Sequence, residues 1–103
     1  GPRPLSNDPE LAAARALFEE RRYDKARERL AQIVLAKPGN AESLYWLGRC
    51  EYELKIYSDA LKHLNEAARQ DATLPNVYVH LALAQLAGGD RKAAEESLKK
   101  AVQ

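Results

Sequence analysis

The chain has 103 residues, of which 46% are hydrophobic and 30% are charged, a composition typical of one soluble globular domain. Sixteen Lys and Arg residues against 15 Asp and Glu residues leave a formal net charge of +1, so no single-sign field favours nucleic acid or an anionic membrane as a partner. No apolar run approaches the ~20 residues that cross a bilayer, and a single cysteine excludes an intrachain disulfide.

The chain opens with a segment that carries no periodicity. Residues 1–7 contain two prolines, a glycine, a serine and an asparagine, and we expect a flexible lead-in whose Gly-Pro start resembles the remnant of a removed tag. Asp8-Pro9 is a helix-start signal, because the Asp side chain accepts a free backbone N–H and proline loses nothing at the first helical position. We therefore predict a first helix over residues 9–20.

Five further helices follow in chain order. The spacing of apolar residues and the turn signals predict helices over residues 24–36, 41–54, 58–70, 75–87 and 91–102. Pro75 is expected to be the first residue of the fifth helix, and Asp90 to cap the sixth. Connections of three or four residues make consecutive helices antiparallel.

A shift of 34 residues superimposes the chain on itself. Ala60 then falls on Ala26 and Ala94, and Leu64 falls on Leu30 and Leu98. Small residues at Gly48, Ala60 and Ala67 are expected to let helix axes approach closely, with Leu47 and Leu64 filling the space between them. A repeat of this length indicates stacked helical hairpins.

The repeat resembles the tetratricopeptide repeat (TPR), whose pattern runs aromatic, Leu-Gly, Tyr, Ala, aromatic or Leu, Ala and Pro. Leu47-Gly48, Tyr57, Ala60, Leu64 and Ala67 carry the resemblance in the central unit. It covers residues 7–103 as units 7–40, 41–74 and 75–103, with 8–103 as the domain. The outer units depart from it, with Ala13-Ala14 and Leu81-Ala82 at the Leu-Gly position, and Glu51 stands where Tyr is common. The resemblance implies an all-α fold, a right-handed α-solenoid of three stacked antiparallel hairpins.

The resemblance also implies a function, because TPR modules bind peptides in a concave groove lined by the first helix of each unit. We therefore expect a non-catalytic interaction module that binds a partner protein or peptide segment, with Tyr45, Arg49 and Tyr52 as central anchors. The expected groove residues are Leu11, Arg15, Phe18, Tyr45, Trp46, Arg49, Tyr52, Val79, His80 and Leu83. Arginine offers bidentate bonds to carboxylates, and tyrosine offers rigid contact area.

A plainer interpretation of the two arginines stays open beside this one. Arg15 and Arg49 can each pair with the glutamate four residues on, Glu19 and Glu53, as ordinary helix-surface ion pairs.

One specific ligand class is disfavoured. Some TPR domains clamp the C-terminal carboxylate of chaperones with Lys, Asn and Arg at set positions. Those positions here hold Leu11, Arg15, Trp46, Asn76 and His80, of which Arg15 alone could play an equivalent part.

The sequence contains no motif for catalysis or metal binding. The chain has no phosphate loop, nucleophile elbow or metal-ligand spacing, so we expect no enzyme activity, cofactor or metal. Cys50 is expected in the core and His63 at a solvated position. Arg27 is expected in a solvated basic cluster with Arg21, Arg22 and Arg29. A cytoplasmic location is favoured, with the native compartment left open.

The alternative function is structural. The chain stops within the second helix of the third unit, so Leu98, Ala101 and Val102 are expected to keep apolar surface in water. Through this uncapped helix the chain could stack on further repeats or on a second copy, as a homo-oligomer.

Overall fold

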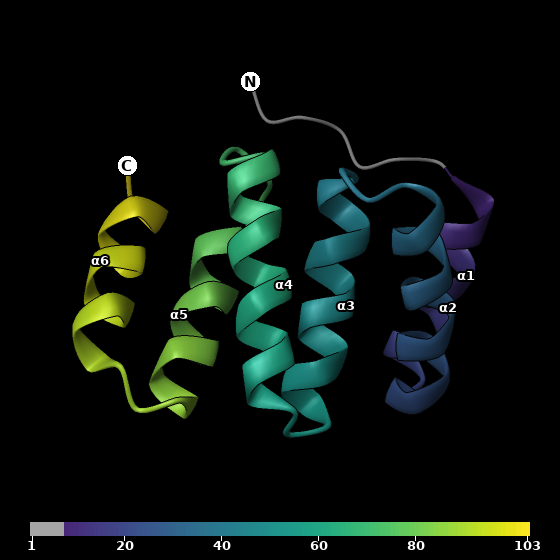
Figure 1. The fold of residues 1–103 in the computed structure, drawn as a ribbon, viewed down its shortest axis with the longest axis horizontal. Helices are drawn as coiled ribbons and strands as arrows, with labels where there is room; N and C mark the ends of the chain where they lie inside the picture. Colours follow the sequence, from purple (N-terminus) through teal and green to yellow (C-terminus); the bar gives the residue numbers. More distant parts are fainter. Residues whose placement is uncertain (1–7) are drawn as a thin grey trace.

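A computed structural model describes residues 8–103, and these residues form six helices and no strand (Figure 1). The segment 1–7, expected as a lead-in, lies outside the described residues. The predicted all-α solenoid of helical hairpins is confirmed, and five of the six helices begin and end within one residue of the predicted bounds. The helices are α1 (Pro9–Glu19), α2 (Tyr23–Ala36), α3 (Ala41–Glu53), α4 (Tyr57–Gln70), α5 (Val77–Ala87) and α6 (Arg91–Ala101).

Each hairpin turns in the same way. Arg21, Lys55 and Gly89 lie 34 residues apart and all adopt left-handed backbone, with φ of 62°, 65° and 86°. In each turn the following N–H bonds to the carbonyl oxygen five residues earlier at 2.8–2.9 Å, which is the Schellman ending of a helix. Only the third turn uses glycine, so Arg21 and Lys55 hold a conformation that costs an L-residue about 1–2 kcal/mol.

Side chains cap three of the helix starts. Asp8 and Asp90 accept backbone N–H groups of α1 and α6, as the sequence predicted, and Asn40 does the same for α3. These bonds satisfy N–H groups that have no partner within the helix.

The prediction that Pro75 begins the fifth helix is wrong. Helix α5 begins at Val77, because Asn76 before it adopts a left-handed conformation with φ of 65°. Asp71 stabilises the start of the connection between α4 and α5. Its carboxylate accepts hydrogen bonds from the Thr73 N–H and hydroxyl at 2.9 and 2.6 Å. Pro75 therefore lies in a turn rather than in the first helical turn.

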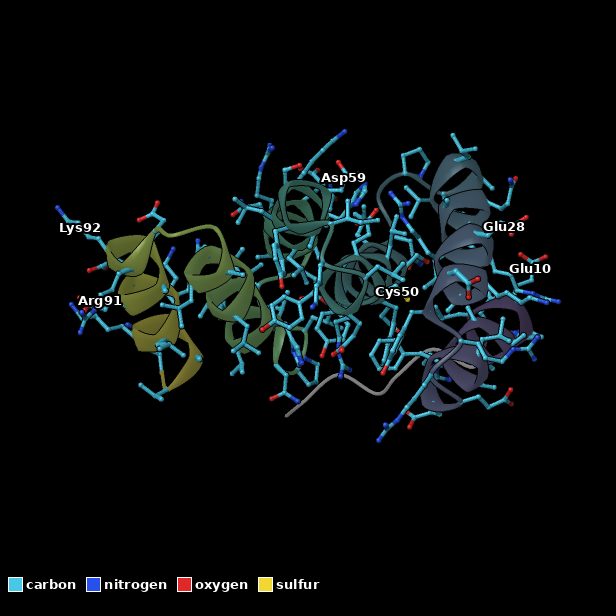
Figure 2. All side chains as sticks on the ribbon, turned by 90° about the horizontal axis from the view of Figure 1, so that it is seen from below. Glu10, Glu28, Cys50, Asp59, Arg91 and Lys92 are labelled. Atoms are coloured by element: carbon cyan, nitrogen blue, oxygen red, sulfur yellow. The ribbon has the colours of Figure 1, made fainter. Side chains whose placement is uncertain are left out.

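The core is centred on α3, which lies between the first hairpin and α4. Ten of its 13 residues are buried, so its sequence faces protein on almost every side. The first helices touch one another, α1 against α3 and α3 against α5, whereas the second helices α2 and α4 do not pack together. The row of hairpins thus closes on one face and opens on the other. Figure 2 shows Cys50 of α3 inside the molecule, whereas Glu10 and Arg91 project from its surface.

Gly48 sets how closely α3 approaches α4. A Cβ atom added at Gly48 would lie 2.6 Å from Cγ of Leu64 and 3.2 Å from the carbonyl oxygen of Ala60, both on α4. Those two residues and Ala67 are fully buried. The close approach expected from the small residues is therefore present, and a methyl group at residue 48 would force the helices apart.

We expect Gly48→Ala to lower the free energy of unfolding by about 1–2 kcal/mol, because overpacking outweighs the helix preference of alanine. Gly88→Ala is the matched control, since its added Cβ would meet no atom closer than 3.5 Å. The control should stay within about 0.5 kcal/mol of wild type or be slightly more stable. Urea unfolding followed by circular dichroism measures both, and equal effects would contradict the packing argument.

Candidate functional site

The ten residues predicted to line a groove all lie on α1, α3 and α5, the first helices of the three hairpins. We call the surface formed by these helices the concave face, because it lies on the side where neighbouring hairpins touch. Within it the ten residues differ in depth. Leu11, Phe18, Tyr45 and Trp46 are buried, Arg15, Arg49, Tyr52 and His80 are half-buried, and Val79 and Leu83 are exposed.

Aromatic rings run across the concave face from the first hairpin to the third. Phe18 meets Trp46 with ring centroids 5.3 Å apart, Trp46 meets Tyr45 at 5.3 Å, and Tyr45 meets His80 at 5.3 Å. All three contacts are edge-to-face, the arrangement that the ring quadrupoles favour. The chain of rings joins α1, α3 and α5 and fixes their relative positions.

Arg49 lies over these rings. Its Cζ atom is 4.6 Å from the ring centroid of Phe18, 4.7 Å from that of Trp46 and 5.6 Å from that of Tyr45. A guanidinium in this position is attracted by the negative ring faces. The ion pair with Glu53, kept open on sequence grounds, is not formed in residues 8–103, because the rings of two hairpins hold the arginine instead.

Arg15 likewise forms no ion pair with Glu19 within the described part of the chain. Its Nε atom is buried without a hydrogen-bond partner there, and so is Nε1 of Trp46. Both atoms are donors only. Within residues 8–103, the concave face therefore carries two arginines without a carboxylate partner, and two buried N–H groups without an acceptor.

His80 adds a polar group that is neutral at ordinary pH. Its Nδ1 lies 3.0 Å from the carbonyl oxygen of Asn76 and 3.0 Å from the hydroxyl oxygen of Tyr45. Because a carbonyl can only accept, Nδ1 carries the proton in the neutral ring and Nε2 is left as an acceptor. Burial lowers the pKa of His80 and outweighs the hydrogen bond to the Asn76 carbonyl, which raises it, and the charge of Arg49 lowers the pKa further. Burial likewise raises the pKa of Tyr45, whose hydroxyl stays protonated.

A small pocket opens beside Arg49 at the edge of this array. Its volume is about 70 Å³, and it lies between α3 and α5 over Leu64 of α4. The side chains that line it combine a cation, a carboxylate and apolar surface: Arg49, Tyr52, Glu53, Leu64, His80 and Leu83.

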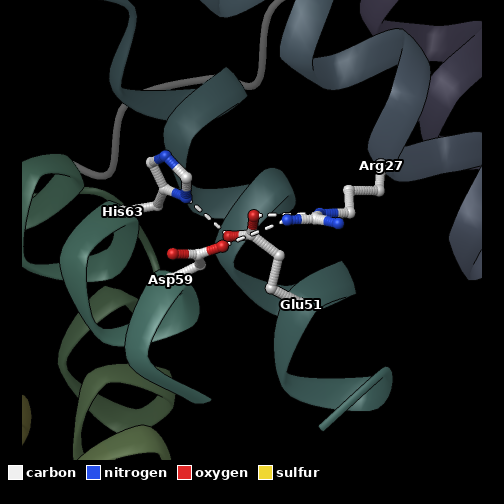
Figure 3. Close-up of polar contacts among 4 residues, drawn as sticks. All are labelled: Arg27, Glu51, Asp59 and His63. Atoms are coloured by element: carbon white, nitrogen blue, oxygen red, sulfur yellow. Dashed lines mark hydrogen bonds and ion pairs between the residues drawn. The ribbon is translucent and has the colours of Figure 1, made fainter. Parts of the chain in front are cut away.

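A polar cluster that the sequence did not predict lies on the opposite side of α3 (Figure 3). Glu51 is only 1% exposed, and its carboxylate accepts from Nε of Arg27 at 3.1 Å and from Nδ1 of His63 at 2.5 Å. Arg27 also donates to Asp59 at 3.1 Å. His63, expected at a solvated position, is mostly withdrawn from water, with 19% of its side chain exposed. Arg21 and Arg22 of the expected basic cluster are exposed, whereas Arg27 is half-buried, because it pairs with the buried carboxylate.

A sequence signal for this cluster existed. Glu51 follows Leu47 by four residues and Leu44 by seven, so a carboxylate stands on the buried stripe of α3. One repeat later Gln85 and Ser97 occupy the places of Glu51 and His63, and the Ser97 hydroxyl donates to the Gln85 side-chain oxygen at 2.7 Å. Polar residues at both positions in two successive repeats indicate a hydrogen bond between the two helices of a hairpin.

The single cysteine lies in the core. Cys50 is fully buried, as expected, and burial raises the pKa of its thiol to about 12, which leaves it unreactive. No group of three His, Cys, Asp or Glu side chains within residues 8–103 is placed to hold a metal ion. Within the same span, every helix is too short or too polar to cross a bilayer.

Comparison with known proteins gives a family and several structural neighbours. A family model described as tetratricopeptide repeat matches residues 11–75. No curated relative matches the chain in sequence. Among solved structures, the type III secretion translocator chaperone SycD of Yersinia enterocolitica is 21% identical, with a TM-score of 0.86 over 95% of this chain and 70% of that one.

Two further neighbours are structures of complexes. PcrH in complex with the chaperone binding region of PopD is 25% identical, with a TM-score of 0.85 over 96% of this chain and 77% of that one. The second TPR of Spaghetti (RPAP3), bound to an HSP90 peptide, is 18% identical, with a TM-score of 0.85 over 90% of this chain and 86% of that one. Likeness at such identities establishes the shared fold.

The lowered pKa of His80 predicts a pH dependence of stability. Below its ordinary value of 6.5 the unfolded chain takes up a proton before the folded protein does. Stability contributed by neutral His80 is therefore present above that value and is lost as the pH falls through the folded pKa. Urea midpoints should fall less steeply for His80→Gln than for wild type between about pH 7.5 and pH 5. The same slope in both proteins would show that His80 titrates normally.

Proposed function

The chain belongs to the tetratricopeptide repeat family, and on that premise we propose that it is a non-catalytic interaction module that binds a segment of a partner protein along the concave face. The observation that carries the proposal is the pair of half-buried arginines on this face, Arg15 and Arg49, without carboxylate partners in residues 8–103. Charged groups withdrawn from water are normally paired. A carboxylate from a partner would supply that pair.

The chemistry of the face describes the segment that would bind. Arg15 and Arg49 favour a carboxylate, and the exposed Val79 and Leu83, at 37% and 39%, favour an aliphatic side chain beside it. His80 offers Nε2 as an acceptor for a backbone N–H. The partner segment is therefore acidic and aliphatic.

The predicted residues divide into two roles under this proposal. Arg15, Arg49, Tyr52, Val79, His80 and Leu83 reach the surface and would contact the segment. Leu11, Phe18, Tyr45 and Trp46 lie beneath them and would hold those side chains in position, which limits the entropy lost on binding.

The structural neighbours lend support of a general kind. PcrH and the Spaghetti domain carry this fold and were solved with a bound segment of another protein. The ligand need not be the same. Leu11, Trp46 and Asn76 occupy clamp positions where chaperone-binding TPR domains carry other residues, so a chaperone C-terminus is not the segment that we propose.

The second candidate function is self-association through α6. The observation that favours it is the exposure of two aliphatic side chains, Leu98 in the last turn of α6 at 44% and Val102 directly after the helix at 86%. Neighbouring exposed aliphatic groups are a frequent feature of interfaces.

Selection from a displayed library of random peptides tests concave-face binding. We expect selected peptides to combine Asp or Glu with Leu, Ile or Val, and to bind Arg15→Gln/Arg49→Gln at least about tenfold more weakly, as loss of charge-assisted hydrogen bonds implies. Arg91→Gln, which changes an exposed arginine on α6, is the matched control and should bind as wild type.

Calorimetry measures these affinities, and circular dichroism verifies that each variant is folded. Peptides that bind the double variant and the wild type equally would remove the concave face as the site. Failure of Leu83→Glu to weaken binding would do the same.

A further inference from the structure

A second groove lies on the face opposite the concave one. Helices α2 and α4 both pack on α3 but not on each other, and the space between them is a cavity of about 580 Å³. We call it the back groove, lined chiefly by Asp24, Glu28, Val34 and Leu35 of α2, Leu47 of α3 and Lys62 of α4. Its volume is in the range of pockets that hold ligands.

One half of the back groove is apolar. Ala31, Val34 and Leu35 succeed one another along α2, and Leu47 of α3 forms the floor. Leu35 is 76% exposed, although it stands beside this apolar surface. An aliphatic side chain from outside would cover Leu35 and Val34 together.

The other half is acidic. Four carboxylates line the groove, those of Asp24, Glu28, Glu51 and Asp59, against two permanent cations, Arg27 and Lys62. Arg27 is already bound to Glu51 and Asp59. Asp24 and Glu28 lie one helical turn apart, are exposed, and form no ion pair within the described residues. An occupant with positive charge beside an aliphatic side chain would complement the groove.

Helix α6 has this chemistry. Leu98 lies in its last turn and Val102 follows directly after the helix, with Lys99 and Lys100 between them in the sequence. Arg91 and Lys92 are exposed at its start, so α6 carries four basic residues against Glu95 and Glu96.

The fold prevents α6 from reaching the back groove of its own chain. The groove lies between α2 and α4, whereas α6 lies beyond α5, so that α4 and α5 stand between α6 and the groove (Figure 1). Figure 2 shows Arg91 and Lys92 at one end of the molecule and Glu28 at the other. Any such contact therefore joins two copies.

We propose that α6 of one copy docks in the back groove of a second copy, with Leu98 and Val102 against Leu35 and Val34, and with Lys99 near Glu28. The proposal rests on self-association, the second candidate function above. The two surfaces differ, so each copy has one of each to offer, and successive copies add head to tail rather than closing as a symmetric pair.

Mixing of blocked variants tests this arrangement on the full chain. Leu35→Glu blocks the groove and leaves α6 intact, whereas Leu98→Glu blocks α6 and leaves the groove intact. Each alone should stay monomeric at concentrations where wild type assembles, and their equimolar mixture should form a discrete 1:1 dimer. Sedimentation velocity measures the species, and circular dichroism verifies folding. Leu86→Glu, a matched change at an exposed leucine of α5, should assemble as wild type does.

A separate experiment tests the proposed pairing of Lys99 with Glu28. Glu28→Lys should weaken assembly at least about tenfold, and adding Lys99→Glu to the same chain should restore it.

The failures of the two proposals are distinguishable. Wild type that stays monomeric across the concentration series overturns self-association together with this docking. If wild type and Leu35→Glu assemble equally well, docking in the back groove is overturned but self-association is not. The same holds if the mixture of Leu35→Glu and Leu98→Glu gives no dimer. Binding of peptides to the concave face is measured separately and depends on neither result.

Discussion

Burial of a carboxylate costs several kcal/mol unless charged or hydrogen-bonding groups surround it, and Glu51 stands within the buried stripe of α3. Its partners come from two different helices, Arg27 from α2 and His63 from α4. Loss of Arg27 would leave the carboxylate without its permanent cation, and loss of His63 would remove one of its hydrogen bonds. The position of Glu51 therefore fixes how the first hairpin sits against the second. Apolar packing alone would define this arrangement less specifically.

The charged side chains on the two faces of α3 differ in whether they have a partner of opposite charge within the chain. On the back, the charge of Glu51 is matched within the chain by Arg27, and His63 forms a hydrogen bond to the same carboxylate. On the front, Arg49 is held by aromatic rings, and within residues 8–103 neither it nor Arg15 of the neighbouring α1 has a carboxylate partner. The same helix thus serves as the structural centre of the solenoid and as the middle of the proposed binding surface.

The sequence predicted the parts of this structure that repeat. The 34-residue period gave six helices and short turns, and the small residue Gly48 indicated the close approach of α3 to α4. The parts that it did not predict depend on neighbours from other hairpins. Whether Arg49 pairs with Glu53 or lies over Phe18 is decided by a ring 31 residues earlier in the chain. The start of α5 was missed because helix propensity does not reveal that Asn76 turns left-handed.

The lack of packing between α2 and α4 also has a mechanical consequence. A curved row of hairpins bends most easily where its outer edge is open, and Arg27 with Asp59 ties that edge between the first and second hairpins. Among the described residues, no ion pair or hydrogen bond ties α4 to α6 in the same way. An ion pair therefore links the outer edge between the first and second hairpins, whereas none does so between the second and third in residues 8–103. We expect changes of curvature to be larger at the second of these junctions.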